Sequence, residues 1–496
     1  MHDSSPILSA KELSFRFPGI EGAAGTTVLE KLSLDVQRKS ATVLFGRADA
    51  GKTTLARIAA GLVPRFTGGV LSGQVLVDDL DTRRVPPYEL MQSVGLVAQD
   101  SEEQILTTRC DAEVAFALES LGIPRPQMRE RVDSSLRRVG LSGFARRNPA
   151  TLSGGEKKRL LVACLDAIRP GLWILDEALG ELDFEWKARV LDLVAEGGGT
   201  ALLMESRWSA LAADRGTTFF LMDAGRIRAQ AADASDPVFT AEVTEAGIRQ
   251  GPGRRPGPRA SGGFLRAEGL EFHFEGSAGF SLAIDSLELR FGEICALVGK
   301  NGSGKSTLGK ILCGLLLPQR GTIGFGEEKG FRSAGAGELS SKVGYLFQNP
   351  DHQIYLPTVR EELNLGLRRQ RSNRSEIESM VVQAASLFGL PDLDAPPALL
   401  SYGARRRLQA ATYYLLSRDI LILDEIDSGL SYREVESLID SLASRVPGIV
   451  LITHDMALAK AAGDRILVME DGRISADASS ERFDDADVFR GQAVSR

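Results

Sequence analysis

Two glycine-rich segments have the residue types and the spacing of a phosphate-binding loop, because both fit the pattern G-x-x-x-x-G-K-[S/T]. In such a loop the glycines let backbone N–H groups close around phosphate oxygens, the lysine neutralises the terminal phosphates, and the hydroxyl holds Mg²⁺. The candidate ATP-binding residues of the first segment are Gly46, Arg47, Ala48, Asp49, Ala50, Gly51, Lys52, Thr53 and Thr54. Those of the second are Gly299, Asn301, Gly302, Ser303, Gly304, Lys305, Ser306 and Thr307.

A pair of acids follows an apolar run in each half of the chain. Asp176 and Glu177 follow L-W-I-L, and Asp424 and Glu425 follow L-I-L. Each run predicts a buried strand that presents two carboxylates at its end. The first acid of a pair can hold Mg²⁺ through water, and the second can polarise an attacking water. Combined with the phosphate loops, the acids predict hydrolysis of MgATP; a solvated acidic strand end is the alternative.

The motifs occur twice at nearly constant offset, so whole domains are duplicated. The loop lysines lie 253 residues apart, and the acidic pairs lie 248 residues apart. Between the copies stands G-P-G-R-R-P-G-P-R, which is too rich in proline and glycine for a helix or strand. We predict a first domain over residues 1–245, a linker over 246–264 and a second domain over 265–496.

Short apolar strands and amphipathic helices alternate within each half, which predicts an α/β domain with a central, mainly parallel sheet. The strands predicted before the phosphate loops cover residues 41–45 and 294–298. Helices are predicted directly after the loops, over residues 55–62 and 308–317. This strand, loop and helix order is the context that a phosphate-binding loop requires.

The composition is that of an ordinary globular protein. The 496 residues include 59 Lys and Arg against 66 Asp and Glu, which argues against disorder and against a protein that coats nucleic acid. The four cysteines form no C-x-x-C pair, so disulfide scaffolds and zinc ribbons are disfavoured. The start of the chain has no leader pattern and no apolar run reaches about 18 residues, so we expect a reduced, intracellular protein that does not span the membrane.

The segment L-S-G-G-E at residues 152–156 resembles the signature motif of ATP-binding-cassette (ABC) ATPases. The resemblance implies two tandem P-loop NTPase nucleotide-binding domains. Each would have a RecA-like parallel-sheet core, an antiparallel β subdomain and a helical subdomain. In that family two cassettes pair head to tail, and each nucleotide lies between one phosphate loop and the other cassette's signature. The signature residues are then Ser153, Gly154, Gly155 and Glu156 in the first half, and Ser401 and Gly403 in the second.

The same resemblance assigns further roles by position. Phe17 and Phe274 resemble the aromatic residue that stacks on adenine, although the period-2 alternation before them equally suits core residues. The implied catalytic residues are Glu425, His454, Gln348 and Glu177. Of these, His454 is similar to the family's switch histidine. The implied Mg²⁺ ligands are Ser306, Gln348 and Asp424 in the second half, and Thr53, Gln99 and Asp176 in the first.

Departures from the family pattern fall on one composite site. Asp49 replaces a loop glycine, Tyr402 replaces a signature glycine, and Ser431 stands where the first half has Asp183. Aligning Gly199 with Gly448 places Glu205 opposite His454. A carboxylate facing the phosphates would cost up to about 3 kcal/mol at roughly 5 Å, whereas Asp49 pointing to solvent would cost little. We therefore expect one hydrolytic site, built on the second phosphate loop, and one mainly structural or regulatory site.

Q-N-P-D-H-Q-I and P-T-V-R-E-E-L in the second half resemble ATPases of energy-coupling factor importers, which take up vitamins and metal ions. The expected partners are a transmembrane subunit and a small substrate-binding membrane subunit. The chain itself is expected at the cytoplasmic face of the membrane, as a peripheral protein. The alternatives are a fused sugar-importer ATPase, a soluble two-cassette protein of ribosomes or DNA, and a binding module without hydrolysis. A metal site at Asp351 and His352 is disfavoured because no other ligands converge. The basic runs at residues 157–159 and 405–407 are predicted to be the polar starts of helices.

Overall fold

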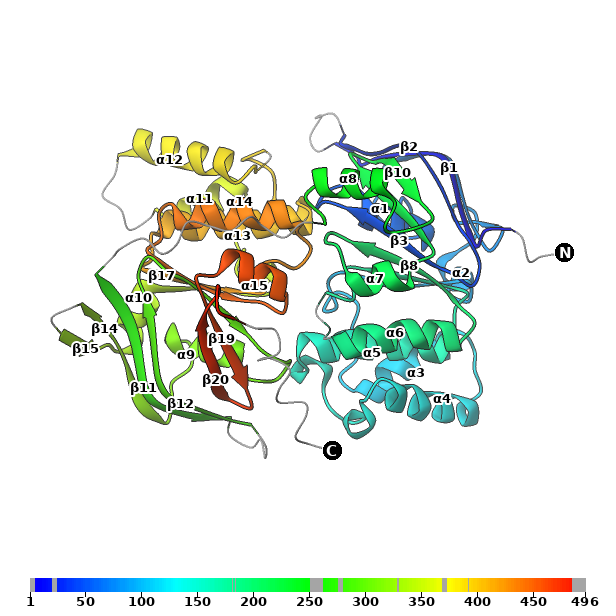
Figure 1. The fold of residues 1–496 in the computed structure, drawn as a ribbon. Helices are drawn as coiled ribbons and strands as arrows, with labels where there is room; N and C mark the ends of the chain where they lie inside the picture. Colours follow the sequence, from blue (N-terminus) through cyan, green and yellow to red (C-terminus); the bar gives the residue numbers. More distant parts are fainter. Residues whose placement is uncertain are drawn as a thin grey trace. The chain divides into compact units, whose positions relative to one another are not determined.

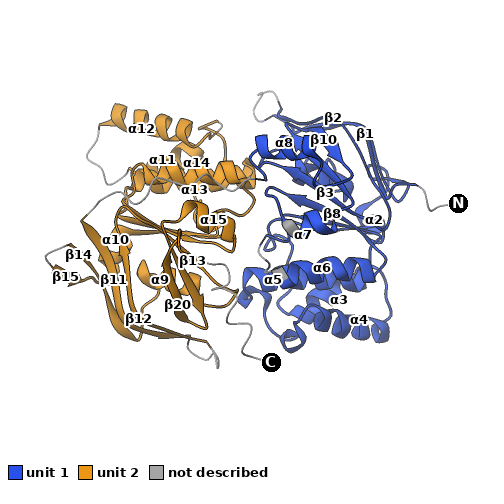
Figure 2. Ribbon diagram, in the orientation of Figure 1, with its two compact units in different colours: residues 1–250 blue, residues 251–496 orange. Residues whose placement is uncertain are grey.

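The chain divides into two compact units, residues 1–250 and 251–496, and each is treated by itself (Figure 2). We describe them from a computed structural model over residues 5–19, 25–180, 182, 184–249, 262–274, 280–327, 330–367, 373–390 and 392–483. Most of the predicted linker lies outside the described residues. The strand that follows it begins at Gly263, inside the stretch predicted as linker, because Phe264 already pairs with Arg290.

The first unit contains ten strands and eight α-helices among its described residues. In chain order these are β1 (Leu8–Arg16), β2 (Thr27–Val36), β3 (Ala41–Gly46), α1 (Lys52–Ala59), β4 (Val70–Val77), β5 (Leu80–Asp81), α2 (Pro87–Leu90), β6 (Val94–Val97), α3 (Cys110–Ser120), α4 (Arg125–Arg138), α5 (Gly154–Ile168), β7 (Leu172–Asp176), α6 (Phe184–Glu196), β8 (Thr200–Glu205), α7 (Ala210–Arg215), β9 (Thr218–Asp223), β10 (Arg226–Ala231) and α8 (Pro237–Glu245).

The elements of the second unit follow the same order as those of the first unit, through the strand pair that corresponds to β9 and β10. Its elements are β11 (Gly263–His273), β12 (Ser281–Arg290), β13 (Ile294–Val298), α9 (Lys305–Leu312), β14 (Arg320–Glu327), β15 (Gly330–Ser333), α10 (Ala336–Lys342), β16 (Val343–Leu346), α11 (Val359–Leu365), α12 (Arg374–Leu387), α13 (Tyr402–Leu416), β17 (Ile420–Asp424), α14 (Tyr432–Ala443), β18 (Gly448–Ile452), α15 (Met456–Ala462), β19 (Arg465–Glu470) and β20 (Arg473–Ser479).

Each unit has two sheets. In the first unit a six-stranded sheet has the order β10-β9-β3-β8-β7-β6, and a four-stranded antiparallel sheet has the order β2-β1-β4-β5. The second unit has the orders β16-β17-β18-β13-β19-β20 and β12-β11-β14-β15. The six-stranded sheets are parallel except for β10 and β20. The strand before each phosphate loop is therefore central, and the carboxyl ends of its parallel neighbours open at the same edge.

Apolar side chains alternate between the two faces of the six-stranded sheet. In the first unit Leu44 and Ile174 pack toward the antiparallel sheet and α1. Their strand neighbours Val43 and Leu175 pack on the opposite face, against α3, α5 and α6. Because both faces are covered, the strands read as continuous apolar runs in the sequence. This core holds the strand ends, and hence the acids, in fixed positions.

A group of helices stands beside each sheet, with α3, α4 and α5 together in the first unit and α11, α12 and α13 in the second (Figure 1). The predicted α/β class, with a mainly parallel core, an antiparallel sheet and a helical part in each half, is confirmed. Over the described ranges, none of the helices combines the length and apolar character needed to cross a membrane.

Candidate functional site

The phosphate loops connect β3 to α1 and β13 to α9, and each loop lysine folds back over its own loop. Lys305 Nζ donates to the carbonyls of Gly299 and Lys300, both at 2.9 Å. Lys52 Nζ donates to the carbonyls of Gly46 at 2.6 Å and Arg47 at 3.1 Å. Both lysines are 5% exposed. Burial lowers the pKa of Lys305 to about 8, against the opposing charges of Glu425 and Asp424. A bound polyphosphate would restore the stabilisation that the buried ammonium lacks.

Asp49 keeps the backbone conformation of the glycine that it replaces. Its φ is 65°, in the left-handed region, and Gly302 in the second loop has φ 81°. A Cβ at Gly302 would meet no atom within 4 Å, and Asp49 itself is exposed. Aspartate tolerates this conformation better than most residues. The first loop therefore retains its shape, and the substitution adds charge at an exposed position.

In the second unit two hydroxyl groups hold the first acid of the pair. The carboxylate of Asp424 accepts a hydrogen bond from Ser306 Oγ at 3.1 Å and a short one from the Tyr345 hydroxyl. Burial and the charge of Glu425 raise the pKa of Asp424, and the hydrogen bonds from Tyr345 and Ser306 lower it. A serine hydroxyl and a carboxylate within hydrogen-bond distance are hard oxygen ligands of the kind that Mg²⁺ prefers. The residues present fit that ion.

The second acid of the pair, Glu425, is held on both sides. Its Oε2 accepts from Gln348 Nε2 at 2.7 Å, and its Oε1 lies 2.5 Å from His454 Nε2. Burial opposes ionisation, but the hydrogen bond and charge of His454 and the charges of Lys305 and Arg406 lower the pKa of Glu425 overall. The carboxylate is therefore ionised at neutral pH, and the charge of the phosphate-loop lysine acts on it.

The first unit arranges its counterpart differently. Glu177 Oε1 accepts a short hydrogen bond from Ser206 Oγ and lies 3.3 Å from Lys52 Nζ, and Lys52 also donates to Ser206 at 2.9 Å. Asp176 is 1% exposed, and burial, together with the charge of Glu177, raises its pKa against a hydrogen bond from the Thr53 side chain. Among the described residues, no hydrogen bond joins the side chains of Gln99 and Glu177, whereas the second unit brings glutamine, glutamate and histidine together.

The strand register corrects one alignment made from the sequence. Glu177 N donates to Met204 O, and Glu425 N donates to Ile452 O, both at 3.0 Å. Met204 therefore corresponds to Ile452, and Ser206, not Glu205, stands where His454 stands in the second unit. The alignment failed because it paired Gly199 with Gly448, whereas the strand pairing matches Thr200 with Gly448. Both Ser206 and His454 contact the second acid of their own unit.

Glu205 is instead a buried carboxyl group on the strand that precedes Ser206. It is 7% exposed, and its Oε1 has no hydrogen bond among the described residues. Burial, followed by the charge of Glu177, raises the pKa of Glu205 from 4.5 to about 8. The second unit has Thr453 at this place, whose hydroxyl donates to Asp427 at 3.2 Å.

This shift predicts a pH dependence of stability. Between about pH 4.5 and about pH 8 the native chain retains a proton on Glu205 that the unfolded chain releases, so the free energy of unfolding falls as the pH rises through this window. Glu205→Gln should therefore raise the melting temperature more at about pH 8 than at about pH 5. Calorimetry of both chains tests this, with the exposed Asp133→Asn as control. A difference that does not grow with pH would contradict the shift.

Tyr345 was not singled out from the sequence. It lies on β16, next to the strand that ends at Asp424, and its position in the first unit is taken by Leu96, whose side chain offers no hydrogen bond. The available signal was a tyrosine three residues before Gln348 on an otherwise apolar strand. The difference explains why Asp424 accepts from a second hydroxyl besides that of Ser306, whereas the strand next to Asp176 offers no such donor.

Tyr345→Phe is expected to raise the Mg²⁺ concentration needed for half-maximal MgATP binding about 5- to 10-fold, because one oxygen of Asp424 loses its donor and the carboxylate loses its fixed orientation. Affinity for ATP without Mg²⁺ should stay the same. Titration of a fluorescent ATP analogue with and without Mg²⁺ separates the two. An unchanged Mg²⁺ requirement would show that Ser306 alone orients the carboxylate.

The predicted signature residues stand at the starts of long helices. Ser153 caps α5 and forms a capping box with Glu156, while Ser401 caps α13 without one, because Ala404 occupies the third position. Both serines are exposed. Exposed hydroxyls and backbone N–H groups at the start of a 15-residue helix suit an anion.

The basic runs after the signatures lie at the starts of α5 and α13, as predicted. Lys158 and Arg406, the middle residues, are 0% exposed. Lys158 Nζ donates to the carbonyls of Ala98 and Gln99, and Arg406 Nη1 donates to Phe347 O at 2.9 Å. The middle residue of each run is therefore buried against the segment that follows β6 or β16.

The segments after Gln99 and Gln348 share two anchors. Gln104 and Gln353 each receive a backbone N–H from the preceding strand end and donate back to it. The buried Glu113 and Glu362 each accept hydrogen bonds from two backbone N–H groups, those of the second and third residues after the glutamine. Leu106 and Tyr355 are held there with 70% and 73% of their surface exposed. Asp351 pairs with Arg405 at 3.2 Å.

The aromatic residues predicted to stack on adenine lie at the ends of β1 and β11. Phe15 and Phe272 are buried, while Phe17 is half-buried and Phe274 is 43% exposed. Phe274 lies edge-on to Phe272 and 6.1 Å from Phe280, which packs beside Gly304 of the phosphate loop. Partly exposed aromatic side chains suit a stacked base, and stacking itself stays a prediction.

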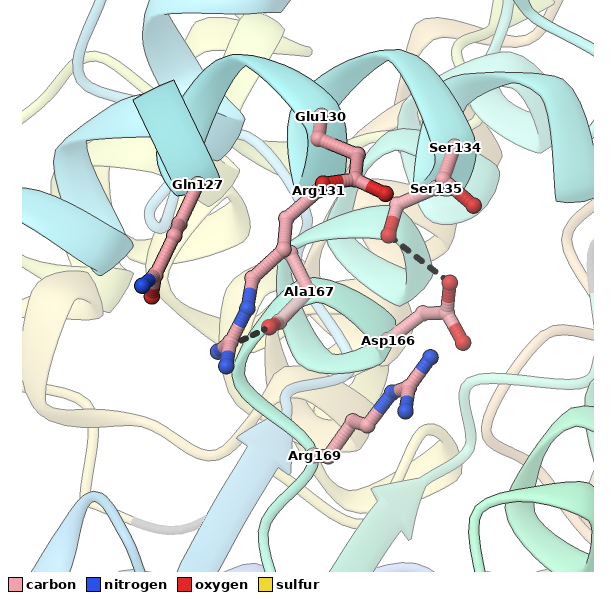
Figure 3. A pocket seen from close by; sticks show the side chains of 8 residues that line it. All are labelled: Gln127, Glu130, Arg131, Ser134, Ser135, Asp166, Ala167 and Arg169. Atoms are coloured by element: carbon pink, nitrogen blue, oxygen red, sulfur yellow. Dashed lines mark hydrogen bonds between the residues drawn. The ribbon is translucent and has the colours of Figure 1, made fainter. Parts of the chain in front are cut away.

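A separate hollow lies between α4 and α5 (Figure 3). The Asp166 carboxylate at its base is already satisfied by Ser135 at 2.8 Å and Arg138 at 2.6 Å. Arg131 donates to Ala167 O at 3.3 Å. The hollow is therefore a junction of the helical part and not an extension of the nucleotide site.

The amino-acid sequence of this chain is similar to those of known proteins. A family model described as "ABC transporter" matches residues 29–180 and 282–428. "Putative ABC transporter ATP-binding protein TTE1589" of Caldanaerobacter subterraneus subsp. tengcongensis is 30% identical over 95% of this chain and 91% of that protein. "Putative HMP/thiamine import ATP-binding protein YkoD" of Bacillus subtilis is 29% identical over 95% and 91%. The solved structure of cbiO1 from Clostridium perfringens, part of the ABC transporter complex cbiONQ, has 28% identity and a TM-score of 0.41, covering 47% of this chain and 94% of that one.

Proposed function

The chain belongs to the ABC transporter family and is one of its ATPases, and from this premise we propose that it powers an importer of the energy-coupling factor type, for a vitamin or a metal ion. The observation that carries the hydrolytic part is the assembly of Gln348, Glu425 and His454 beside Lys305. The loop after Gln348, with its motif typical of energy-coupling factor ATPases, supports the importer class. The name of YkoD, an HMP/thiamine import protein, agrees with it.

In this proposal the second unit binds ATP through its phosphate loop. Lys305 neutralises the terminal phosphates, and Ser306, Asp424 and Gln348 hold Mg²⁺, which supplies charge neutralisation when bound. Glu425, ionised and oriented by Gln348 and His454, accepts a hydrogen bond from the attacking water and polarises it. Phe274 stacks on the adenine.

We further propose that the two units pair head to tail, so that the loop of each unit faces the signature of the other. Lys305 then shares a nucleotide with Ser153 and Gly154 of the intact signature, and Lys52 shares one with Ser401 and Gly403 of the altered one. The first loop also has its lysine bonded to Ser206 and close to Glu177. The first site binds nucleotide in this proposal and turns it over slowly.

The loops that follow Gln99 and Gln348 are the proposed docking surface for the transmembrane subunit. Leu106 and Tyr355 present large apolar side chains to solvent, and the buried Glu113 and Glu362 fix the backbone beneath them. An exposed apolar side chain on an anchored loop suits contact with a partner helix. The partner would include a small substrate-binding membrane subunit, and the chain would lie at the cytoplasmic face of the membrane.

Leu106→Asp combined with Tyr355→Asp is expected to remove the membrane partner from the affinity-purified, detergent-solubilised complex, because a charge at the centre of an apolar contact prevents burial. ATP binding by the isolated chain should not change. Val382→Asp, at a 48% exposed position on α12, is the matched control. Retention of the membrane subunit by the double variant would contradict this docking surface, and recovery of ribosomal proteins from the unmutated chain would contradict the transport role.

A further inference from the structure

Tyr402, which replaces a signature glycine, is folded back into its own unit. It is the first residue of α13, and its hydroxyl donates to the carbonyl of Gln348 at 3.2 Å. The same hydroxyl accepts from Arg406 Nη2 at 2.9 Å, and the guanidinium lies 5.2 Å from the centre of the tyrosine ring. The phenol and the guanidinium therefore act as one hydrogen-bonded pair.

Arg406 also bonds two backbone segments of the hydrolytic site, the one that contains Gln348 and the one that contains Glu425. It is 0% exposed, its Nη1 donates to Phe347 O at 2.9 Å, and its Nη2 also reaches the carbonyl of Glu425 at 3.2 Å. Its charge contributes to the lowered pKa of Glu425. The carbonyls of Phe347 and Glu425 thus accept from one buried guanidinium, and the carbonyl of Gln348 accepts from the tyrosine that this guanidinium bonds. The side chains of Gln348 and Glu425 meet at 2.7 Å.

The first unit has only part of this arrangement. Gly154 stands at the place of Tyr402 and offers no hydroxyl, and Lys158 stands at the place of Arg406. The bonds recorded for Lys158 reach the carbonyls of Ala98 and Gln99. An ammonium lacks the planar fork that lets a guanidinium bridge two chain segments. Within the described part of that unit, no hydrogen bond joins the side chains of Gln99 and Glu177.

We propose that Tyr402 and Arg406 are positioning residues for the hydrolytic site of their own unit, which hold Gln348 and Glu425 in contact. The inference rests on the proposed function, in which Glu425 polarises water. It gives the tyrosine a role within its own unit that is distinct from any effect on the nucleotide facing the altered signature. Loss of the pair should slow turnover without weakening ATP binding, since the hydrogen bonds described above join the pair to the carbonyls of residues 347, 348 and 425 and not to the phosphate loop.

The test uses the full chain carrying Glu177→Gln, so that turnover reports the second unit alone. In this background Tyr402→Phe and Arg406→Lys should each lower kcat about 5- to 20-fold with KM for ATP unchanged within about two-fold. The double variant should lose no more than the stronger single variant, because both changes break one network. Tyr402→Gly, which restores the family's glycine, should also lower kcat. Tyr414→Phe removes a hydroxyl from the same helix and should have no effect.

Three results would overturn the inference: an unchanged kcat in Tyr402→Phe, an equal loss in Tyr414→Phe, or a kcat in Tyr402→Gly at or above that of the background. If Arg406→Lys fails to fold, Tyr402→Phe still tests the inference, because it removes only the hydroxyl oxygen and should leave the fold intact. The chain carrying both Glu177→Gln and Glu425→Gln separates the two levels of the argument. Residual turnover in that chain would refute the proposed hydrolytic site, whereas its loss together with a normal Tyr402→Phe would refute only the positioning role.

Discussion

Glu425→Gln is expected to lower steady-state ATP turnover of the chain at least about 100-fold, and Glu177→Gln is expected to lower it less than about 3-fold. Glutamine keeps the size of Glu425 and one hydrogen-bonding oxygen but cannot accept a proton from water. Glu425 has a lowered pKa and is oriented by Gln348 and His454. Glu177 accepts a hydrogen bond from Ser206 Oγ and lies 3.3 Å from the ammonium of Lys52.

The measurement is phosphate release at saturating MgATP by the two variants and the unmutated chain, with equilibrium ATP binding beside it. Binding should persist in both variants, because neither acid is needed to hold the phosphates. Equal losses in the two variants, or a larger loss in Glu177→Gln, would contradict the assignment of turnover to the second unit.

His454→Ser is expected to lower turnover about 10- to 100-fold, because it gives the second unit the serine of the first. The register of β8 and β18 places Ser206 and His454 at equivalent positions, each in contact with the second acid. Serine is too short to reach both that acid and a terminal phosphate. The lost imidazole would leave Glu425 oriented from one side only.

The reciprocal variant, Ser206→His, is the control for this comparison. It should not reduce total turnover, and it should break the bond between Ser206 and Lys52. Both chains are measured by the same phosphate-release assay, with ATP binding as the check on folding. If His454→Ser retains full turnover, the histidine is dispensable and the difference between the units has another origin.

The fold and the phosphate-loop motifs could be predicted from the sequence. Strands β3 and β13 were predicted within one residue, because both faces of the parallel sheet are buried and the strands are continuous apolar runs. The phosphate loops were found because their glycines are required by the backbone: a Cβ at Gly304 would lie 2.9 Å from Phe280. Such constraints are local, so a single sequence reveals them.

The remaining parts of the site depend on contacts between distant segments. Ser206 was misaligned because a glycine pair was matched instead of the strand hydrogen bonds. Tyr345 was not singled out, and Arg406 was predicted only as part of the polar start of a helix. The tyrosine hydroxyl bonds Asp424, and the guanidinium bonds the carbonyl of Glu425. Neither interaction has a sequence spacing that marks it. Asp49 is the opposite case: its replacement of a loop glycine is evident from the sequence, but the loop keeps the same backbone conformation.

The measurement that tests the central claim most directly is a single-turnover experiment on the full chain. The chain is loaded with labelled ATP in the absence of Mg²⁺, freed of excess nucleotide, and then mixed with Mg²⁺ while labelled ADP is followed in time. We predict that one of the two bound nucleotides is converted rapidly and the other persists, and that Glu425→Gln removes the rapid phase. Rapid conversion of both nucleotides, or a rapid phase that survives in Glu425→Gln, would contradict a single competent site built on the second unit.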